Sequence, residues 1–166
     1  MADVSSLYRA APALATRTVS TDALTGVQAL ERKHPGLPPA PGKVARREFE
    51  YVCHGTASFI LSRDVVTGLL VAPWCGATRT EADFLAHVQG VVGTDLAVAR
   101  WHFVVDNLNI HCSASLVRYV AAFSDLDLDL GEKGKSGILH TCQSRAAFLR
   151  DPGHRLVFHY TPTHSS

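Results

Sequence analysis

Apolar runs that end abruptly in polar turns predict most of the strands in this chain. The clearest is Phe103–Val105, which lies inside the segment 101–106 and is followed at once by a polar turn. A second apolar run, Arg155–Thr161, predicts the last strand. Shorter segments bounded by Gly, Pro or polar residues predict further strands at 17–21, 27–30, 48–53, 59–63 and 69–72, with a turn at 54–56.

Apolar residues at helical spacing predict three helices. Thr80–Asp83 has the pattern of a capping box, and the apolar positions of 84–92 then fall on one helical face before Gly93 ends the helix. A second helix is predicted to begin at Ser113, and a third to span about 144–150. Residues 1–15 have no clear period, so we expect an irregular N-terminal arm followed by one domain over 16–166.

The order of these elements indicates an α/β fold with a mixed sheet and helices on its faces. The strands first follow one another as a meander and then alternate with helices. A right-handed crossover makes the 101–106 strand parallel to an earlier strand. If that neighbour is the 17–21 strand, Asp22 and Asp106 lie at the same end of the sheet, where α/β proteins place their chemistry.

Composition adds limits of its own. Of the 166 residues, 46% are apolar and 19% are charged, and the net charge is +1, which argues against a strong attraction of the whole surface to nucleic acid but allows a local basic patch. No run is long enough to span a membrane and the start lacks a secretory signal, so we expect a cytoplasmic protein without a membrane partner. Because the cysteines are far apart and form no C-x-x-C pair, we expect free thiols at Cys53, Cys75, Cys112 and Cys142.

The pair Asp22 and Asp106 is the sharpest candidate for chemistry. Two carboxylates on neighbouring strands can bind Mg²⁺, and two such metals can stabilise a phosphodiester displacement. Spacing alone leaves the alternative open that Asp106 starts a turn and Asp22 only solvates a loop. Asn107 and His111 are candidates for supporting the site or contacting a phosphate, although a polar turn before a helix explains them as well.

A basic cluster follows a loop that contains four prolines. The loop is Lys33–Gly42, and Lys43, Arg46 and Arg47 come directly after it. These side chains are the best local candidates for contact with DNA phosphates, which needs little sequence specificity. An ordinary solvated loop is an equally good interpretation, because so few charges are involved.

Several motifs occur together in a fixed order along nearly the whole chain, from about residue 3 to 166. The motifs are Val19-Ser-Thr-Asp22 with Thr25-Gly-Val-Gln-Ala-Leu-Glu-Arg32, His54-Gly-Thr56, Phe103-Val-Val-Asp-Asn-Leu-Asn-Ile-His111, Gly134-Lys-Ser-Gly137 and His159-Tyr-Thr-Pro-Thr-His164. With these motifs in this order, the chain resembles the catalytic domain of bacterial insertion-sequence transposases of the mariner superfamily, the DDE transposases.

The resemblance implies a ribonuclease H-like fold in which the first two acidic residues lie on neighbouring parallel strands. It implies that Asp22 and Asp106 are the first two metal-binding carboxylates, and that Mg²⁺ or Mn²⁺ is the cofactor. It further implies DNA as the partner, at transposon ends and at the target. The implied reaction is attack by a hydroxyl group on a phosphodiester, with water for cleavage and a DNA 3′ end for joining.

Two departures from the family pattern shape the expected function. Ala23 stands where members usually carry an acidic residue, and the family's third catalytic acid lies on a helix beyond the last strand, which this sequence does not reach. We therefore expect a truncated domain that lacks the C-terminal helix and the N-terminal DNA-binding region, and that is inactive alone. The alternatives are a non-catalytic remnant that binds DNA weakly, or a partner of a full-length transposase that associates through its last strand.

Overall fold

The computed structural model describes residues 2–9 and 15–162 and is built on a five-stranded mixed sheet in the order β3-β2-β1-β4-β5. The strands are β1 (Thr16–Arg32), β2 (Tyr51–Asp64), β3 (Leu70–Gly76), β4 (Arg100–Val105) and β5 (Leu156–Tyr160). The first three strands form antiparallel pairs, whereas β4 runs parallel to both β1 and β5. The predicted mixed α/β sheet is confirmed, and β1 and β4 are neighbouring parallel strands, as the resemblance to a ribonuclease H-like fold implied.

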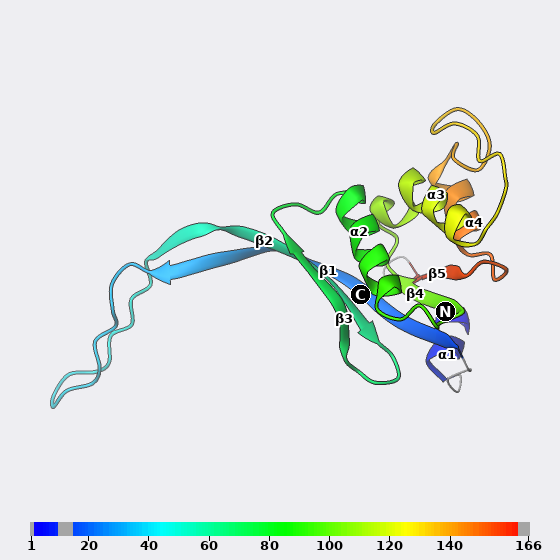
Figure 1. The fold of residues 1–166 in the computed structure, drawn as a ribbon. Helices are drawn as coiled ribbons and strands as arrows, with labels where there is room; N and C mark the ends of the chain where they lie inside the picture. The colour runs from blue at the N-terminus through cyan, green and yellow to red at the C-terminus, as the bar shows by residue number, and fades with distance from the viewer. Residues whose placement is uncertain (1, 10–14, 163–166) are drawn as a thin grey trace.

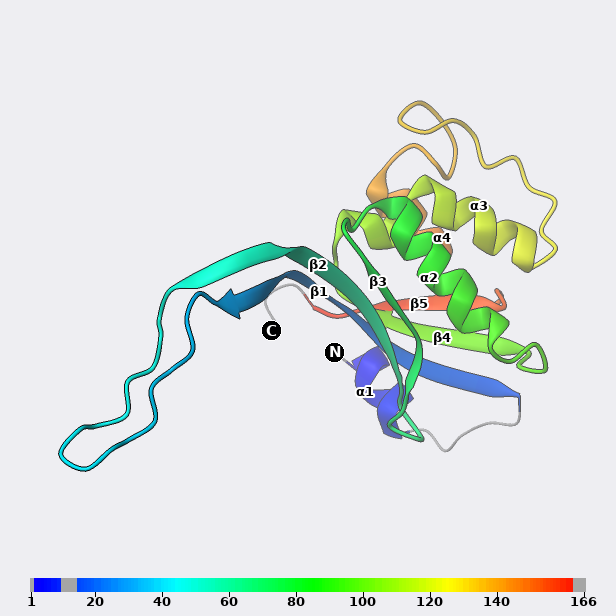
Figure 2. The same cartoon turned by 60° about the vertical axis from the view of Figure 1, so that its left-hand side comes forward.

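Helices cover both faces of the sheet, as Figures 1 and 2 show. On one face lie α2 (Glu81–Gly93), α3 (Ala114–Phe123) and α4 (Cys142–Leu149), and α1 (Ala2–Arg9) lies on the other. A short 3₁₀ helix, η1 (Asn109–Cys112), leads into α3. The sequence pattern predicted no helix before residue 16. A helix of eight residues, which depends on packing for its stability, is too short to carry a clear period.

The core lies between the sheet and the α2/α3 layer. Its largest fully buried side chains include Trp101, Phe84, Phe103 and Phe158, and the rings of Phe103 and Phe158 stack across β4 and β5 with their centroids 5.1 Å apart. The predicted capping box of α2 is confirmed, because the Thr80 side chain accepts a hydrogen bond from the backbone N–H of Asp83 and the Asp83 carboxylate accepts one from the backbone N–H of Thr80. The helix therefore begins where the sequence placed it.

Two predicted strand boundaries are wrong, because β1 and β2 are longer than their sequence patterns. β1 continues through Asp22 without a break, and the predicted turn at 54–56 lies inside β2. The glycines in these segments mark irregularities in the ladder between the two strands rather than turns. Gly26, at φ 69°, lies between Leu24 and Val27, where the register shifts. Pairing along two long strands therefore outweighs the local signal of a turn.

The ends of β1 and β2 project from the body of the protein as a hairpin arm, visible in Figures 1 and 2. We use the term hairpin arm for residues 24–59, of which 33–50 connect the two strands. Isolated bridges pair Leu37 with Arg46 and Ala40 with Lys43, so the connection is itself a loosely paired ribbon. Several apolar side chains of the arm are exposed, among them Val44 and Phe49 at 82% each.

The prediction of four free thiols is wrong for two of the cysteines. Cys112, at the end of η1, forms a disulfide with Cys142, the first residue of α4. The prediction relied on local spacing, and these residues are 30 positions apart and meet only because α4 packs on η1. Cys53 and Cys75 are free and exposed. None of the helices in the described part of the chain could cross a membrane.

Candidate active site

The parallel ladder between β1 and β4 brings the two candidate carboxylates to the same level of the sheet. Its last residue pair is Ser20 with Val104, and Asp22 and Asp106 each lie two residues farther along their strand direction. The predicted parallel neighbours are therefore the right ones. The expectation that Asp22 ends its strand is wrong, since it lies within β1 and pairs with Leu61 of β2.

Asp22 is an exposed side chain on a well-supported stretch of backbone. Its Oδ1 accepts a hydrogen bond from the N–H of Ala23 at 2.7 Å. The preceding residue, Thr21, is buried on the helix-covered face and begins a chain of side-chain hydrogen bonds. Thr21 Oγ1 lies 2.7 Å from Ser62 Oγ, which lies 2.7 Å from His87 Nε2. This Thr21–Ser62–His87 chain ties β1, β2 and α2 together beside Asp22.

The imidazole of His87 is neutral at neutral pH. Its side chain is 2% exposed, and burial lowers its pKa to about 4. The sequence pattern did not predict this buried chain of hydrogen bonds. The available signal was weak, consisting of a polar residue on the apolar face of a helix and another on the inward face of a strand.

Asp106 follows the last residue of β4 and is oriented by the turn into η1. Its Oδ1 accepts a hydrogen bond from the N–H of Leu108 at 3.1 Å and lies 2.7 Å from Nδ1 of His111. The Asp106 side chain is 46% exposed, whereas that of His111 is 2% exposed and packs against the ring of Phe84. One side of the Asp106 carboxylate is therefore held by the protein and the other faces solvent.

The Nδ1 atom of His111 lies 2.7 Å from Asp106 Oδ1 and 3.1 Å from the backbone carbonyl oxygen of Asp106. Burial lowers the pKa of His111, and its contacts with Asp106 oppose that shift only in part; the positive charge of Arg79 lowers the pKa further. Because a carboxylate can only accept, the Nδ1 atom must carry the ring proton. Of the two candidate supporting residues, His111 thus contacts a candidate carboxylate directly. Asn107 instead donates from its side chain to the backbone carbonyl of Thr161.

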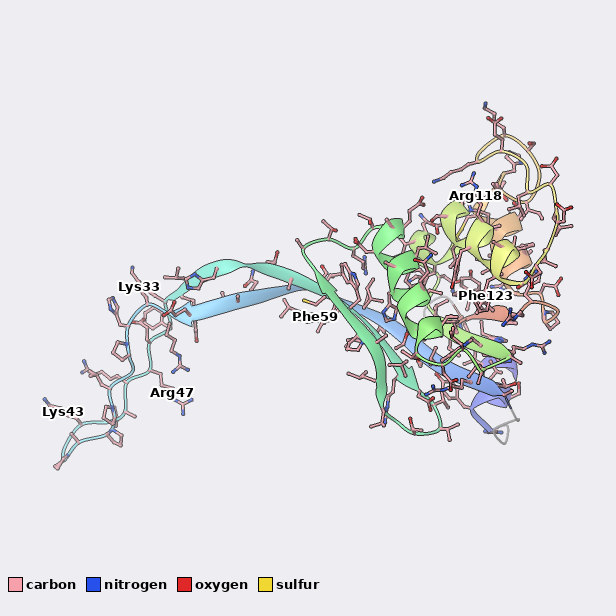
Figure 3. The ribbon with its side chains drawn as sticks, viewed as in Figure 1. Lys33, Lys43, Arg47, Phe59, Arg118 and Phe123 are labelled. Carbon is pink, nitrogen blue, oxygen red and sulfur yellow. A yellow bond between two sulfur atoms is a disulfide. The ribbon has the colours of Figure 1, made fainter. Side chains whose placement is uncertain are left out.

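The basic cluster lies apart from the two carboxylates. Lys43, Arg46 and Arg47 are exposed on the hairpin arm, which Figure 3 shows extending away from the sheet and its helices. The structure therefore separates the predicted phosphate-binding residues from Asp22 and Asp106, which lie in the sheet and at the end of β4. Among the residues that the structure describes, no group of three or more His, Cys, Asp or Glu side chains could hold a metal.

A family model described as DDE superfamily endonuclease matches residues 17–166. The chain belongs to this family. The match covers every strand of the sheet, both candidate carboxylates and the hairpin arm, and it agrees with the family expected from the motifs.

Among solved structures, the DDE superfamily endonuclease chain is similar to one described as the mariner Mos1 paired end complex with Mg. The sequence identity is 13% and the TM-score is 0.40, with 73% of this chain covered. The matched region spans 37% of that chain. No curated protein matches the sequence.

Proposed function

We propose that this chain is the core of a DDE-type transposase catalytic domain, which cleaves and joins DNA strands with the help of Mg²⁺ or Mn²⁺. Asp22 and Asp106 are the metal-binding carboxylates in this proposal. The observation that carries it is the β1–β4 ladder, which brings these two residues to the same level on neighbouring parallel strands in a member of the DDE superfamily endonucleases.

The chemistry of the two side chains fits a hard divalent cation. Mg²⁺ is usually held by one or two carboxylates together with water and substrate phosphate oxygens. Within the described residues, Asp22 and Asp106 are both contacted through Oδ1, so that each Oδ2 is left for a further ligand. A bound metal would act as a Lewis acid toward the phosphodiester.

The protein's own contribution is to hold the carboxylates. Asp22 is fixed by β1, which pairs with β2 at this position, and Asp106 is fixed by the N–H of Leu108 and by His111. The His111 ring, whose Nδ1 lies 2.7 Å from Oδ1, orients the Asp106 carboxylate. Residues that orient metal ligands in this way commonly affect metal affinity strongly.

The DNA partner belongs to this proposal as well. Lys43, Arg46 and Arg47 are exposed on the hairpin arm, where their charges can reach the backbone of a duplex that lies against the protein. A site that binds two metals usually needs more carboxylate ligands than these two. We propose that a further acidic ligand comes from outside the described residues, and that the 166-residue chain alone cleaves DNA poorly.

A second candidate function is that of a non-catalytic partner of a full-length transposase, or of a second copy of this chain. The hairpin arm favours this function. Apolar residues at 37, 44 and 49 are exposed to solvent on a projecting segment, and a partner protein could bury them. In that case the chain contributes contacts and weak DNA binding rather than chemistry.

Mn²⁺ binding tests the proposed function. We expect the 166-residue chain to bind Mn²⁺, as measured by electron paramagnetic resonance, and Asp22→Asn and Asp106→Asn each to weaken binding by about tenfold or more. Asp127→Asn, in an exposed loop, is the matched control and should leave the affinity unchanged. Equal Mn²⁺ binding by all four proteins would remove the site assignment. DNA binding that persists in the presence of a chelator, with no Mn²⁺ binding, would favour the second candidate.

A further inference from the structure

The disulfide lies next to the residue that orients Asp106. His111 and Cys112 are consecutive residues of η1, so the crosslink to Cys142 anchors the backbone directly beyond the imidazole that contacts the carboxylate. Cys112 is 2% exposed, while Cys142 is only partly buried. A buried covalent link thus holds the segment that presents His111.

Two side chains from later in the sequence hold the same segment. The Tyr160 hydroxyl, on β5, donates to the carbonyl of His111 at 2.8 Å. Arg145, on α4, donates from Nε to the carbonyl of Cys112 at 2.6 Å and from Nη1 to the carbonyl of Leu139 at 2.9 Å. The crosslink and Arg145 both originate from α4, so both couple the position of this helix to that of η1.

From this geometry we propose that the Cys112–Cys142 disulfide and Arg145 are positioning elements for Asp106, and that reduction of the disulfide loosens this carboxylate. The link between α4 and η1 keeps the His111 ring in its hydrogen bond with Asp106. The consequence for metal binding rests on the proposed function, whereas the positioning of Asp106 by η1 does not.

The Cys112–Cys142 disulfide is reduced by an ordinary thiol–disulfide exchange with a dithiol. A thiolate of the reductant attacks Sγ of Cys142, the more accessible sulfur; the S–S bond breaks and Cys112 leaves as a thiolate that takes up a proton. The second thiol of the reductant then attacks the mixed disulfide and releases Cys142. Two electrons pass to the protein, which gains two thiols, and the reductant becomes a cyclic disulfide.

Two backbone hydrogen bonds near Asp106 report directly on the position of η1. The N–H of Leu108 donates to Asp106 Oδ1, and the N–H of His111 donates to the carbonyl of Leu108. Movement of η1 breaks both bonds without breaking the β4 ladder, so hydrogen exchange at these two amides separates a change of position from a loss of the fold. The NMR signals of the His111 ring report the same contact from the side chain.

The experiment compares the metal-free 166-residue chain in its oxidised form and after reduction with dithiothreitol. We expect reduction to speed exchange at Leu108 and His111 by about tenfold, while the amides of β4 change little. Cys142→Ser should act as reduction does and should no longer respond to the reductant, and Arg145→Gln should speed exchange in the oxidised protein. The controls are Cys75→Ser and Arg118→Gln, which alter an exposed free cysteine and an exposed arginine.

The outcomes distinguish this inference from the proposed function. Unchanged exchange and unchanged His111 signals on reduction would overturn the inference, as would equal acceleration of all amides, which reports a general loss of stability. Mn²⁺ affinity should fall by about tenfold on reduction, at the lower end of what the loss of a supporting group costs a metal site. If Leu108 and His111 respond but neither form binds Mn²⁺, the positioning stands and the proposed function fails.

Discussion

Acidification should destabilise this protein through His87 before most of its carboxylates are protonated. The folded protein holds the imidazole in the core with a pKa of about 4, whereas the unfolded chain titrates near 6.5. As the pH falls below 6.5, the unfolded chain binds a proton that the folded chain excludes, and stability is lost until the pH reaches about 4.

The size of this loss follows from the two pKa values. The contribution of one group is RT ln[(1 + 10^(pKU − pH))/(1 + 10^(pKF − pH))], where pKU and pKF are its unfolded and folded pKa values. It amounts to a loss of about 2 kcal/mol in the free energy of unfolding between about pH 7 and about pH 5. His87 is 2% exposed, so solvent screening reduces this value little.

Urea unfolding at the two pH values, followed by circular dichroism, measures the effect. His87→Gln can keep a hydrogen bond to Ser62 and has no proton to gain, so its stability should depend on pH by about 2 kcal/mol less than that of the parent. His140→Gln, in which an exposed imidazole is replaced, is the matched control. If His87→Gln loses as much stability on acidification as the parent and the control, the buried neutral imidazole is not the cause.

Three further predictions concern the arm, a helix end and the chemistry. Neutralising Lys43, Arg46 and Arg47 to Gln should weaken binding of duplex DNA at low salt and reduce the slope of log K against log salt by about 2–3; unchanged binding would leave the arm without this role. Thr80→Ala should cost about 1 kcal/mol in urea unfolding, with Thr80→Ser close to the parent, and equal stability of all three would contradict the capping. Plasmid nicking by the 166-residue chain with Mn²⁺ should be negligible, and robust nicking that disappears in Asp106→Asn would refute this.

Local signals predicted the elements that depend on neighbouring residues. Helix α2 was found because Thr80 and Asp83 cap each other and the apolar residues that follow recur on one face. Strand β4 is predictable because it lies inside the sheet between β1 and β5, where the side chains of Phe103–Val105 are all buried and form one apolar run. The sequence pattern divides β1 at Asp22 and β2 at the turn-like residues 54–56, whereas pairing between the two strands continues through both positions.

For the candidate site, the sequence predicted which strands carry the two aspartates but not the contacts that support them. The handedness of a crossover predicted only that the 101–106 strand is parallel to an earlier strand, and the family resemblance implied that this neighbour carries Asp22. The contacts that support them come from distant segments: Ser62 of β2 and His87 of α2 meet beneath Thr21, and Cys142 of α4 meets Cys112. Such contacts follow from how the helices pack on the sheet, and no local spacing in the sequence reports them.

The two carboxylates are held in different ways, and this difference has consequences for regulation. Asp22 lies within a strand that is paired with β2 on one side and belongs to the same sheet as β4 on the other, so displacing it requires disruption of the sheet. Asp106 lies beyond the end of β4, and its orientation depends on the N–H of Leu108 and on His111, which belong to a short segment. That segment can shift while the core of the sheet stays intact. Any control over a site formed by these two residues should therefore act on Asp106, through η1, rather than on Asp22.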